Sequence, residues 1–176
     1  AGEYEAKEVM IDEPASEIEV SLTTAWDSLY VSEGRDNLDG DSLFSAALGL
    51  AYGNWVFEAW HAEGSGGDYS ELNLGGGYGF SFGGFDCYLA YAHLWFFDDD
   101  DSDNELAAGI SYGALPFEIT AAADYVYSFR AEGSYFELSL AKTKELTDRL
   151  ALETALWAGI NQGYVGDGHR DFDHLS

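Results

Sequence analysis

The chain has little cysteine, proline or positive charge. Its 176 residues include one cysteine, two prolines and seven lysines and arginines, against 33 acidic residues and a net charge of -26. A single cysteine excludes an internal disulfide, and Cys87 falls on an apolar strand face, where we expect a small hydrophobic side chain. Because cations bind phosphates, the charge balance excludes nucleic acid as a partner and favours small cations.

Long hydrophobic runs are also missing. No stretch approaches the roughly 20 apolar residues that a membrane-spanning helix needs. The chain does not begin with a basic region and an apolar core, so we expect that a secretory signal peptide has already been removed. Residues 1–16 form, in this interpretation, a polar and acidic N-terminal lead-in, and residues 17–176 form one domain.

What the chain does have is alternation of apolar and polar residues with a period of two. In residues 42–52, for example, Phe44, Leu48 and Leu50 alternate with serine, alanine and glycine. Such alternation predicts β-strands. Nine such strands are expected, followed by a fragment of a tenth: 17–31, 42–52, 55–62, 71–80, 85–97, 105–112, 117–125, 136–140, 150–159 and 172–176.

The connections between these strands are alternately short and long. The short ones are 53–54, 81–84, 113–116 and 143–148, and the long ones are 32–41, 63–68, 98–104, 128–133 and 161–171. This rhythm is typical of an antiparallel up-and-down transmembrane β-barrel, in which turns on one side are tight and loops on the other are extended. We therefore predict an all-β barrel.

Aromatic residues support a bilayer over a soluble β-protein, because amphipathic rings gather at the two membrane interfaces. One predicted belt lies beside the short turns: Tyr52, Trp55, Phe57, Tyr78, Phe80, Phe82, Phe85, Tyr112 and Phe117. The other lies beside the long loops: Trp26, Tyr30, Trp60, Tyr69, Trp95, Phe96, Phe97, Tyr125, Tyr127, Phe129, Tyr135 and Phe136. We therefore expect a lipid bilayer as the main partner and the bacterial outer membrane as the location.

The predicted number of strands, nine and a fragment of a tenth, does not fit a closed barrel. Bacterial single-chain barrels have an even number of strands, and an open edge in lipid leaves backbone groups unpaired. We therefore expect a chain that is incomplete at its C-terminus, from a barrel of 10–12 strands. A complete ten-stranded barrel with a very short last strand is the alternative.

These patterns resemble the porin-like class of bacterial outer-membrane β-barrels over nearly the whole chain. The segment Val20–Arg35, with Ser28-Leu29-Tyr30 and then Glu33-Gly34-Arg35, is similar to the first hairpin of the uncharacterised Gcw_chp barrel group. That group has Arg-Gly where this chain has Gly34-Arg35. The resemblance implies an outer-membrane location, and it implies no chemistry.

Acidic residues occupy the face that we expect to line the lumen. They are Glu19, Asp27, Glu58, Glu71, Asp86, Glu118, Asp124, Glu137 and Glu153. Carboxylates beside an aqueous path concentrate cations and repel anions. We predict a passive, cation-preferring channel for small solutes. The alternative is a plugged structural or interaction barrel that presents acidic loops to an outer-membrane partner or to a second copy in a homo-oligomer.

The densest charge lies in one predicted loop and could hold Ca²⁺ or Mg²⁺ through hard oxygen ligands. Its candidate ligands are Asp98, Asp99, Asp100, Asp101 and Asp103. Neither Asn104 nor Ile110 fits the glycine and glutamate that an EF-hand starting at Asp99 requires, and a solvated acidic loop is the alternative. No other cofactor is expected.

Enzymatic signals are sparse, and we expect a protein that is not an enzyme. The element His174-Leu175-Ser176 resembles the His-x-Ser element of outer-membrane lipid A deacylases, so a lipid-modifying enzyme is a further alternative. His61 and His93 lack a third ligand at a spacing diagnostic of zinc.

Overall fold

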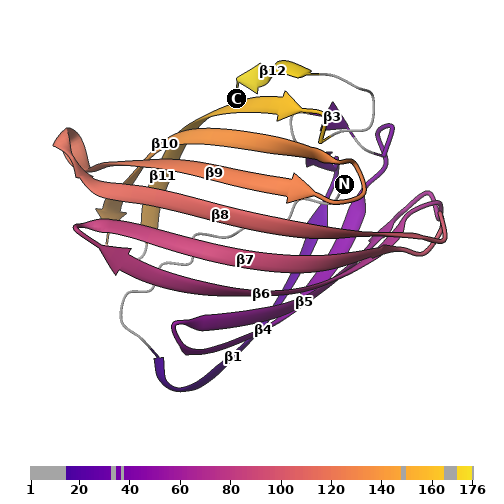
Figure 1. Cartoon of the computed structure of the whole chain (residues 1–176), viewed down its shortest axis with the longest axis horizontal. Coiled ribbons are helices and arrows are strands. Elements are labelled where there is room, and N and C mark those ends of the chain that lie inside the picture. The colour runs from indigo at the N-terminus through magenta and orange to yellow at the C-terminus, as the bar shows by residue number, and fades with distance from the viewer. Residues whose placement is uncertain (1–14, 33–34, 37, 148–149, 165–169, 176) are drawn as a thin grey trace.

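One antiparallel sheet of ten strands dominates the computed structural model, which describes residues 15–32, 35–36, 38–147, 150–164 and 170–175 (Figure 1). The strands follow one another in chain order, each paired with its neighbours. They are β1 (Ala15–Asp27), β4 (Leu43–Gly53), β5 (Trp55–Gly64), β6 (Ser70–Phe82), β7 (Phe85–Phe96), β8 (Asp101–Leu115), β9 (Ile119–Ser128), β10 (Gly133–Thr147), β11 (Leu150–Gln162) and β12 (Arg170–Leu175). The predicted all-β, up-and-down architecture is confirmed.

The sheet curves, but within the described residues it does not close, because β1 and β12 stand at its two edges and neither pairs with the other. The described part of residues 1–16 is limited to Ala15 and Ser16, which already belong to β1. Most of the predicted N-terminal lead-in therefore lies outside the described residues, and so does Ser176. No helix among the residues described is long and apolar enough to cross a membrane.

Short and long connections alternate as the sequence predicts. Gly53, with a φ of 57°, lets β4 turn into β5 across Asn54, and Gly83 and Gly84, with φ values of 60° and 86°, form the turn between β6 and β7. Positive φ is the conformation that glycine adopts without steric cost. In Figure 1 these tight turns lie on the left of β6–β9, and the other connections lie on the right. We call the two ends the short-turn end and the long-loop end.

The two faces of the sheet follow from the pairing register, since side chains directly opposite one another on paired strands share a face. Gly109, for example, lies opposite Tyr88 on one side and Asp124 on the other. We call this face the inner face. On it Tyr164, beyond the end of β11, reaches Glu105 of β8, so the inner face is the concave one.

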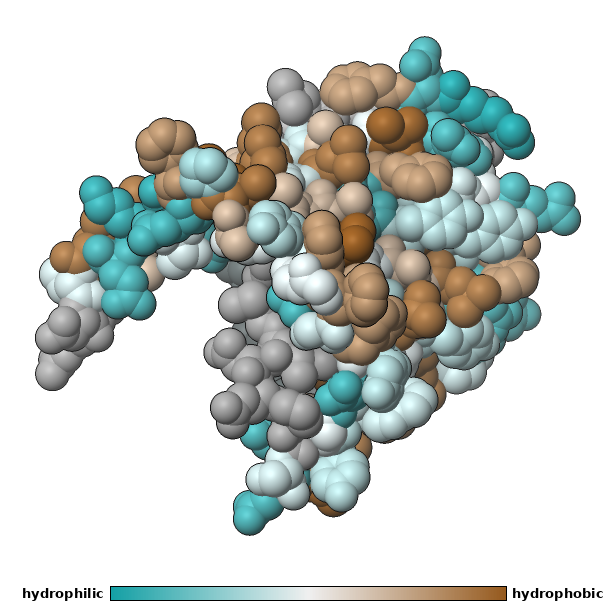
Figure 2. Space-filling model, turned by 60° about the vertical axis from the view of Figure 1, so that its left-hand side comes forward, coloured by the Kyte–Doolittle hydropathy of each residue, from teal (hydrophilic) through white to brown (hydrophobic). Residues whose placement is uncertain are grey.

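The opposite, outer face carries large apolar side chains on every long strand. Examples are Leu22 of β1, Leu48 of β4, Leu89 of β7 and Leu138 of β10, all of them exposed. In Figure 2 brown and pale side chains cover the middle of the visible face, and teal side chains gather along its margins. The alternation in the sequence therefore separates an apolar outer face from a polar inner one.

Most strand bounds differ from the predicted ones by a few residues, and β10 (Gly133–Thr147) is much longer than the predicted 136–140. Three differences bear on the candidate site. β8 begins at Asp101, so the end of the predicted loop 98–104 is strand. Residues 116–118 form a 3₁₀ turn, so Glu118 belongs to the turn and β9 begins after it. The long connection after β1 contains a small hairpin of β2 (Val31–Ser32) and β3 (Arg35–Asp36).

Candidate functional site

Most of the acidic residues predicted to line a lumen share the inner face. The register places eight of them there: Glu19, Asp27, Glu58, Glu71, Asp86, Asp124, Glu137 and Glu153. The ninth, Glu118, is exposed in the turn before β9, where its carboxylate lies 3.9 Å from Lys142. That the eight carboxylates line a pore remains a prediction.

The predicted lumen set omits several inner-face carboxylates, and two of them, Asp103 and Glu105, are buried. Asp103 lies opposite Leu94, and Glu105 lies opposite Ala92, so both side chains share the face of Asp124. Asp103 was assigned to an acidic loop because it ends a run of aspartates. The available signal was parity, since Asp103 and Glu105 continue the alternation of Gly109 and Ser111 toward the N-terminus.

These two residues belong to a group of buried polar side chains at the long-loop end of the inner face. We call the group the polar layer, and it comprises Glu71, Asn73, Asp103, Glu105, Ser128 and Asn161. Glu71 and Asn161 have no exposed surface at all. Because a buried carboxylate is costly unless hydrogen bonds or counter-charges replace its water, the partners of each carboxylate are informative.

Tyrosines provide several of those partners. The Tyr69 hydroxyl donates to Oε2 of Glu71, and the Tyr164 hydroxyl donates to Oε1 of Glu105 at 2.5 Å. Burial raises the pKa of the Tyr69 phenol above its ordinary value, so the hydroxyl keeps its proton and remains a donor. Tyr164 also lies with its ring centroid 6.0 Å from that of Tyr135. The polar layer is therefore held from several strands at once.

Asp103, near the start of β8, is hydrogen-bonded to the end of β9 and to the β9–β10 turn. Its Oδ1 accepts from the backbone N–H of Arg130 at 2.8 Å and of Asn104 at 2.6 Å, and its Oδ2 accepts from the Ser128 hydroxyl. Nearby, the Arg130 guanidinium lies 2.5 Å from the carboxylate of Asp101. These charge-assisted bonds fix the long-loop end of β8 and β9.

An apolar cluster lies beside the polar layer on the inner face, at the long-loop end of β4 and β5. Its buried members are Tyr30, Leu43 and Ala62, with Leu38, Trp60 and Tyr69 packed against them. The predicted long-loop belt is therefore wrong for several residues. Tyr30, Trp60, Tyr69 and Tyr135 pack on the inner side, because their strand parity or loop position turns them away from the outer face.

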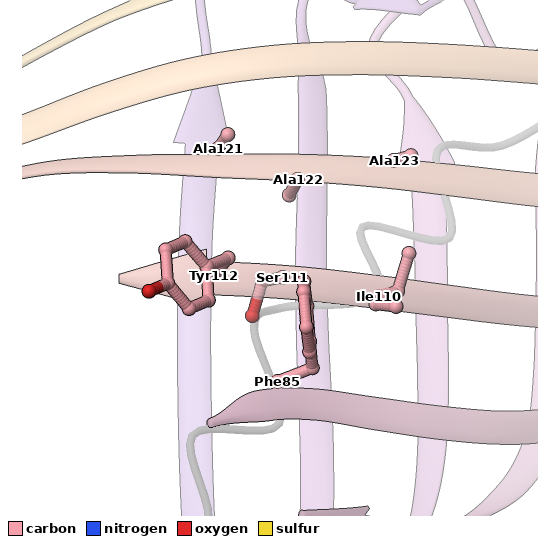
Figure 3. A pocket seen from close by; sticks show the side chains of 7 residues that line it. All are labelled: Phe85, Ile110, Ser111, Tyr112, Ala121, Ala122 and Ala123. Carbon is pink, nitrogen blue, oxygen red and sulfur yellow. The ribbon is translucent and has the colours of Figure 1, made fainter. Parts of the chain in front are cut away.

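The predicted short-turn belt does lie outside. Trp55 and Tyr78 meet edge to face with centroids 4.9 Å apart, and Phe85 and Tyr112 lie at the same distance. Between β8 and β9 the outer face has a shallow hollow of about 200 Å³. Figure 3 shows Phe85 and Tyr112 beside Ala121, Ala122 and Ala123. The hollow is lined mostly by apolar side chains.

The middle of the inner face carries small residues around a few polar ones. Gly49, Gly75, Ala90 and Ala107 lie on it, and the Tyr88 hydroxyl donates to Asp124 at 2.8 Å. Lys142 and Lys144 are on the outer parity of β10, since their neighbour Leu140 is exposed there. Among the described residues of the long strands β1 and β4–β11, no lysine or arginine occupies the inner face.

The acidic run divides between two environments. Asp98, Asp99 and Asp100 lie in the exposed turn, whereas Asp101 and Asp103 are in β8 with the contacts given above. Among the described residues, no group of three or more His, Cys, Asp or Glu side chains is arranged to hold a metal ion. Calcium or magnesium binding at the turn stays a prediction.

His61 and His93 make local contacts. Nδ1 of His61 lies 2.9 Å from the backbone oxygen of Glu71, and Nδ1 of His93 lies 2.7 Å from Oδ1 of Asn104. The backbone of His174, in β12, lies opposite Gly159 of β11. Ser176 lies outside the described residues. The His-x-Ser hypothesis for a lipid-modifying enzyme is therefore not tested.

Comparisons with known proteins add little beyond the fold. No family model matches the chain, so the similarity to the Gcw_chp group is unsupported, and no curated protein matches it. Among solved structures, the chain is similar to the anion-selective porin from Comamonas acidovorans, with 16% identity and a TM-score of 0.39. The match covers 93% of this chain and 54% of the porin, so the chain spans about half of that protein's length. A likeness this distant carries no argument about activity, and the ten-stranded antiparallel sheet rests on the chain's own structure.

Proposed function

We propose that this chain forms the wall of a bacterial outer-membrane β-barrel that lets small solutes diffuse passively and prefers cations. The observation that carries the proposal is the contrast between the two faces of one sheet. Exposed apolar side chains cover the outer face, and carboxylates occupy the inner face of the long strands β1 and β4–β11, whose described residues place no lysine or arginine there.

The outer face supports the membrane part of this proposal. Monomeric soluble proteins rarely expose large contiguous apolar patches, whereas the outward face of a transmembrane barrel is an apolar band between aromatic girdles. Leu50, Leu89 and Ile110 are exposed on this face, and the belt with Trp55 and Tyr78 lies at the short-turn end. A bilayer would cover this surface without another protein.

The inner face supports the preference for cations. Asp86 and Glu153 are exposed near the short-turn end, and Asp124 lies farther along the same face. Carboxylates in a confined aqueous path raise the local concentration of cations, because the low-dielectric wall focuses their field. Small inner residues such as Gly75 and Ala107 leave room beside them.

Single-channel recording in a planar bilayer tests the proposal. Under a salt gradient we expect a reversal potential of cation-selective sign, which moves toward zero in the triple variant Asp86→Asn, Asp124→Asn, Glu153→Gln. The matched control removes three charges from the exposed turn with Asp98→Asn, Asp99→Asn and Asp100→Asn, and it should shift selectivity much less. Anion-selective openings, or no conductance from a protein shown to be inserted, would contradict the proposal.

A second candidate function is a plugged barrel that acts in structure or interaction. The burial of Glu71, Leu94 and Asn161 at the long-loop end favours it, because packed side chains there would obstruct a water path. Such a barrel would present the acidic turn 97–100 to a partner or to a second copy of the chain. Silence in the bilayer, together with a co-purifying partner that the Asp98–Asp100 variant loses, would support this candidate over the channel.

A further inference from the structure

We propose that Lys142 and Lys144 bind the phosphate of one anionic phospholipid at the short-turn end of the outer face. The proposal rests on the membrane part of the proposed function, because it assumes that a bilayer covers the outer face, and it does not depend on conduction. It goes beyond that function by assigning a headgroup site with named binding groups, whereas a wall covered by hydrocarbon requires none.

The first argument is where the scarce positive charge lies. The chain has seven lysines and arginines against 33 acidic residues. On the described parts of the long strands β1 and β4–β11, Lys142 and Lys144 are the only two of the seven, and they are two residues apart on β10, so they share a face. Lys144 lies opposite Leu152, which is exposed on the outer face. The positive charge of these strands is therefore concentrated on the side that faces the proposed bilayer.

The second argument is the depth of the two ammonium groups. Nζ of Lys142 donates to the backbone oxygen of Phe117 at 2.5 Å, and Phe117 lies in the 3₁₀ turn between β8 and β9. Lys144 is nearer than Lys142 to the end of β10 at Thr147. Both lysines therefore lie at the rim of the sheet, at the level where a membrane barrel meets the headgroups and where long cationic side chains keep their charge in water.

The third argument is the supply of hydrogen-bond donors. A lysine ammonium has three N–H groups. Lys142 uses one of them for Phe117, and the carboxylate of Glu118 is 3.9 Å away, which is too long for a hydrogen bond. Lys144 makes no hydrogen bond or ion pair with the residues described. The pair can therefore donate several charge-assisted hydrogen bonds to the oxygens of a phosphate.

The fourth argument is the apolar surface beside the lysines. Leu140, Leu152 and Leu156 lie on the same outer face, and all three are exposed. Acyl chains can cover these leucines while the phosphate of the same molecule meets the ammonium groups. Inorganic phosphate would gain nothing from the leucines, and a zwitterionic headgroup carries a cation of its own that opposes the lysines. The chemistry therefore favours a phospholipid with a net negative charge, such as phosphatidylglycerol.

Native mass spectrometry of the full chain, refolded in detergent micelles, tests this site by counting the lipids that stay bound. Phosphatidylglycerol and phosphatidylcholine with identical acyl chains are titrated in parallel, and the fraction of protein that carries one lipid gives each dissociation constant. One lysine beside an anionic lipid surface favours binding by about fivefold, so two should give phosphatidylglycerol an advantage of about tenfold or more. The double variant Lys142→Gln, Lys144→Gln should lose most of that advantage and bind phosphatidylcholine as the wild type does.

Single variants locate the effect. Lys144→Gln and Arg130→Gln each remove one positive charge, the first at the short-turn end and the second in the β9–β10 turn at the long-loop end, and only the first should weaken the preference. Glu118→Gln removes the carboxylate beside Lys142 and should strengthen it. Equal binding of the two lipids by the wild type, or an equal loss in Lys144→Gln and Arg130→Gln, would overturn the site.

Competition with inorganic phosphate separates a lipid from a free anion. Ammonium phosphate replaces part of the ammonium acetate at constant ionic strength, and phosphatidylglycerol should stay bound. Its displacement would show that the site recognises phosphate alone, and would overturn the lipid. Because lipid binding does not require conduction, a silent barrel that keeps the lysine-dependent preference would reject the channel and keep the site. A cation-selective barrel that binds both lipids equally would do the reverse.

Discussion

The short-turn end and the long-loop end of this sheet differ in where their aromatic residues lie, because only the long-loop end also places several of them on the inner face. At the short-turn end the aromatic residues, such as Trp55 and Tyr78, lie outside, and acidic residues of the inner face such as Glu153 remain exposed. At the long-loop end Tyr30, Tyr69 and Tyr135 lie on the inner side, where Tyr69 donates a hydrogen bond to the buried carboxylate of Glu71. A tyrosine near a strand end is therefore not by itself a membrane anchor, because strand parity decides whether its side chain lies on the outer or the inner face.

The difference also separates two sources of stability. In the proposed bilayer the outer belt would gain free energy from contact with hydrocarbon, whereas the inner end depends on packing and on hydrogen bonds between connections. Substitutions at the two ends should then change the free energy of unfolding by different amounts and for different physical reasons. The predictions below compare one end with the other, from the largest expected effect to the smallest.

The largest effect should come from a cavity at the inner end. Leu94→Ala removes a side chain with no exposed surface, and we expect a loss of about 2–5 kcal/mol in the free energy of unfolding. Leu89→Ala, on the same strand but 58% exposed on the outer face, loses apolar contact without leaving an enclosed cavity. Urea unfolding in vesicles measures both. An equal cost for the two variants would show that the inner end is not packed.

Asp103→Ala should have the next largest effect. It leaves the backbone N–H of Arg130 and the Ser128 hydroxyl without their acceptor, and hydrogen bonds to a charged group contribute about 1.5–3 kcal/mol. The turn 129–132 should also become more sensitive to protease. Asp99→Ala in the exposed turn is the control, with an expected change within about 0.5 kcal/mol. If the control is equally damaging, the loss reflects net charge and not the Asp103 contacts.

Gly133→Ala tests how closely the chain approaches itself at the inner end. A Cβ at Gly133 would collide with the backbone of Gly163, which cannot move aside as a flexible side chain could. We expect a loss of about 1–3 kcal/mol, as for other overpacked sites. At the short-turn end, a Cβ at Gly113 meets Thr120 at an ordinary 3.6 Å, so Gly113→Ala should be close to neutral. Thermal unfolding of the two variants, side by side, checks the contrast.

The smallest effect concerns the outer belt. Trp55 and Tyr78 form an edge-to-face pair, and a double-mutant cycle with Trp55→Leu and Tyr78→Leu should give a coupling of about 0.5–1.5 kcal/mol. The same cycle on Trp55 and Phe85, which share no ring contact in the structure, serves as the reference. A coupling near zero for the Trp55–Tyr78 pair would mean that the two rings contribute to stability independently of each other.

Much of the sheet could be predicted because its signals are local. Strict alternation and Gly53-Asn54 predict the β4–β5 hairpin, and the parity of Glu71 and Asp124 places both on the inner face. The missed start of β8 has a physical cause. A run of aspartates is typical of a solvated loop, but pairing with β7 and the bonds of Asp103 to the next turn extend the strand through it.

The composition of the polar layer could not be predicted in the same way. Tyr164 reaches Glu105 across the two intervening strands β9 and β10, and Trp60 packs against a cluster that includes Leu43 of β4 and Tyr30. The residue periodicity within one segment does not predict such contacts between distant segments. The misplacement of Glu118 has a local reason, since Pro116 and the positive φ of Phe117, 67°, delay the start of β9 to Ile119, two residues after the start that alternation predicts.

The bond between Tyr164 and Glu105 also has a consequence for the order of assembly. Each hairpin joins strands that are adjacent in the chain, and so it closes a small loop at low entropic cost, whereas this bond joins residues 59 positions apart. Contacts that span many residues usually form after the rate-limiting step, and their removal then speeds unfolding without slowing folding. We expect Tyr164→Phe to unfold faster than the wild type and to fold at the same rate. The tyrosine would then determine the lifetime of the folded sheet.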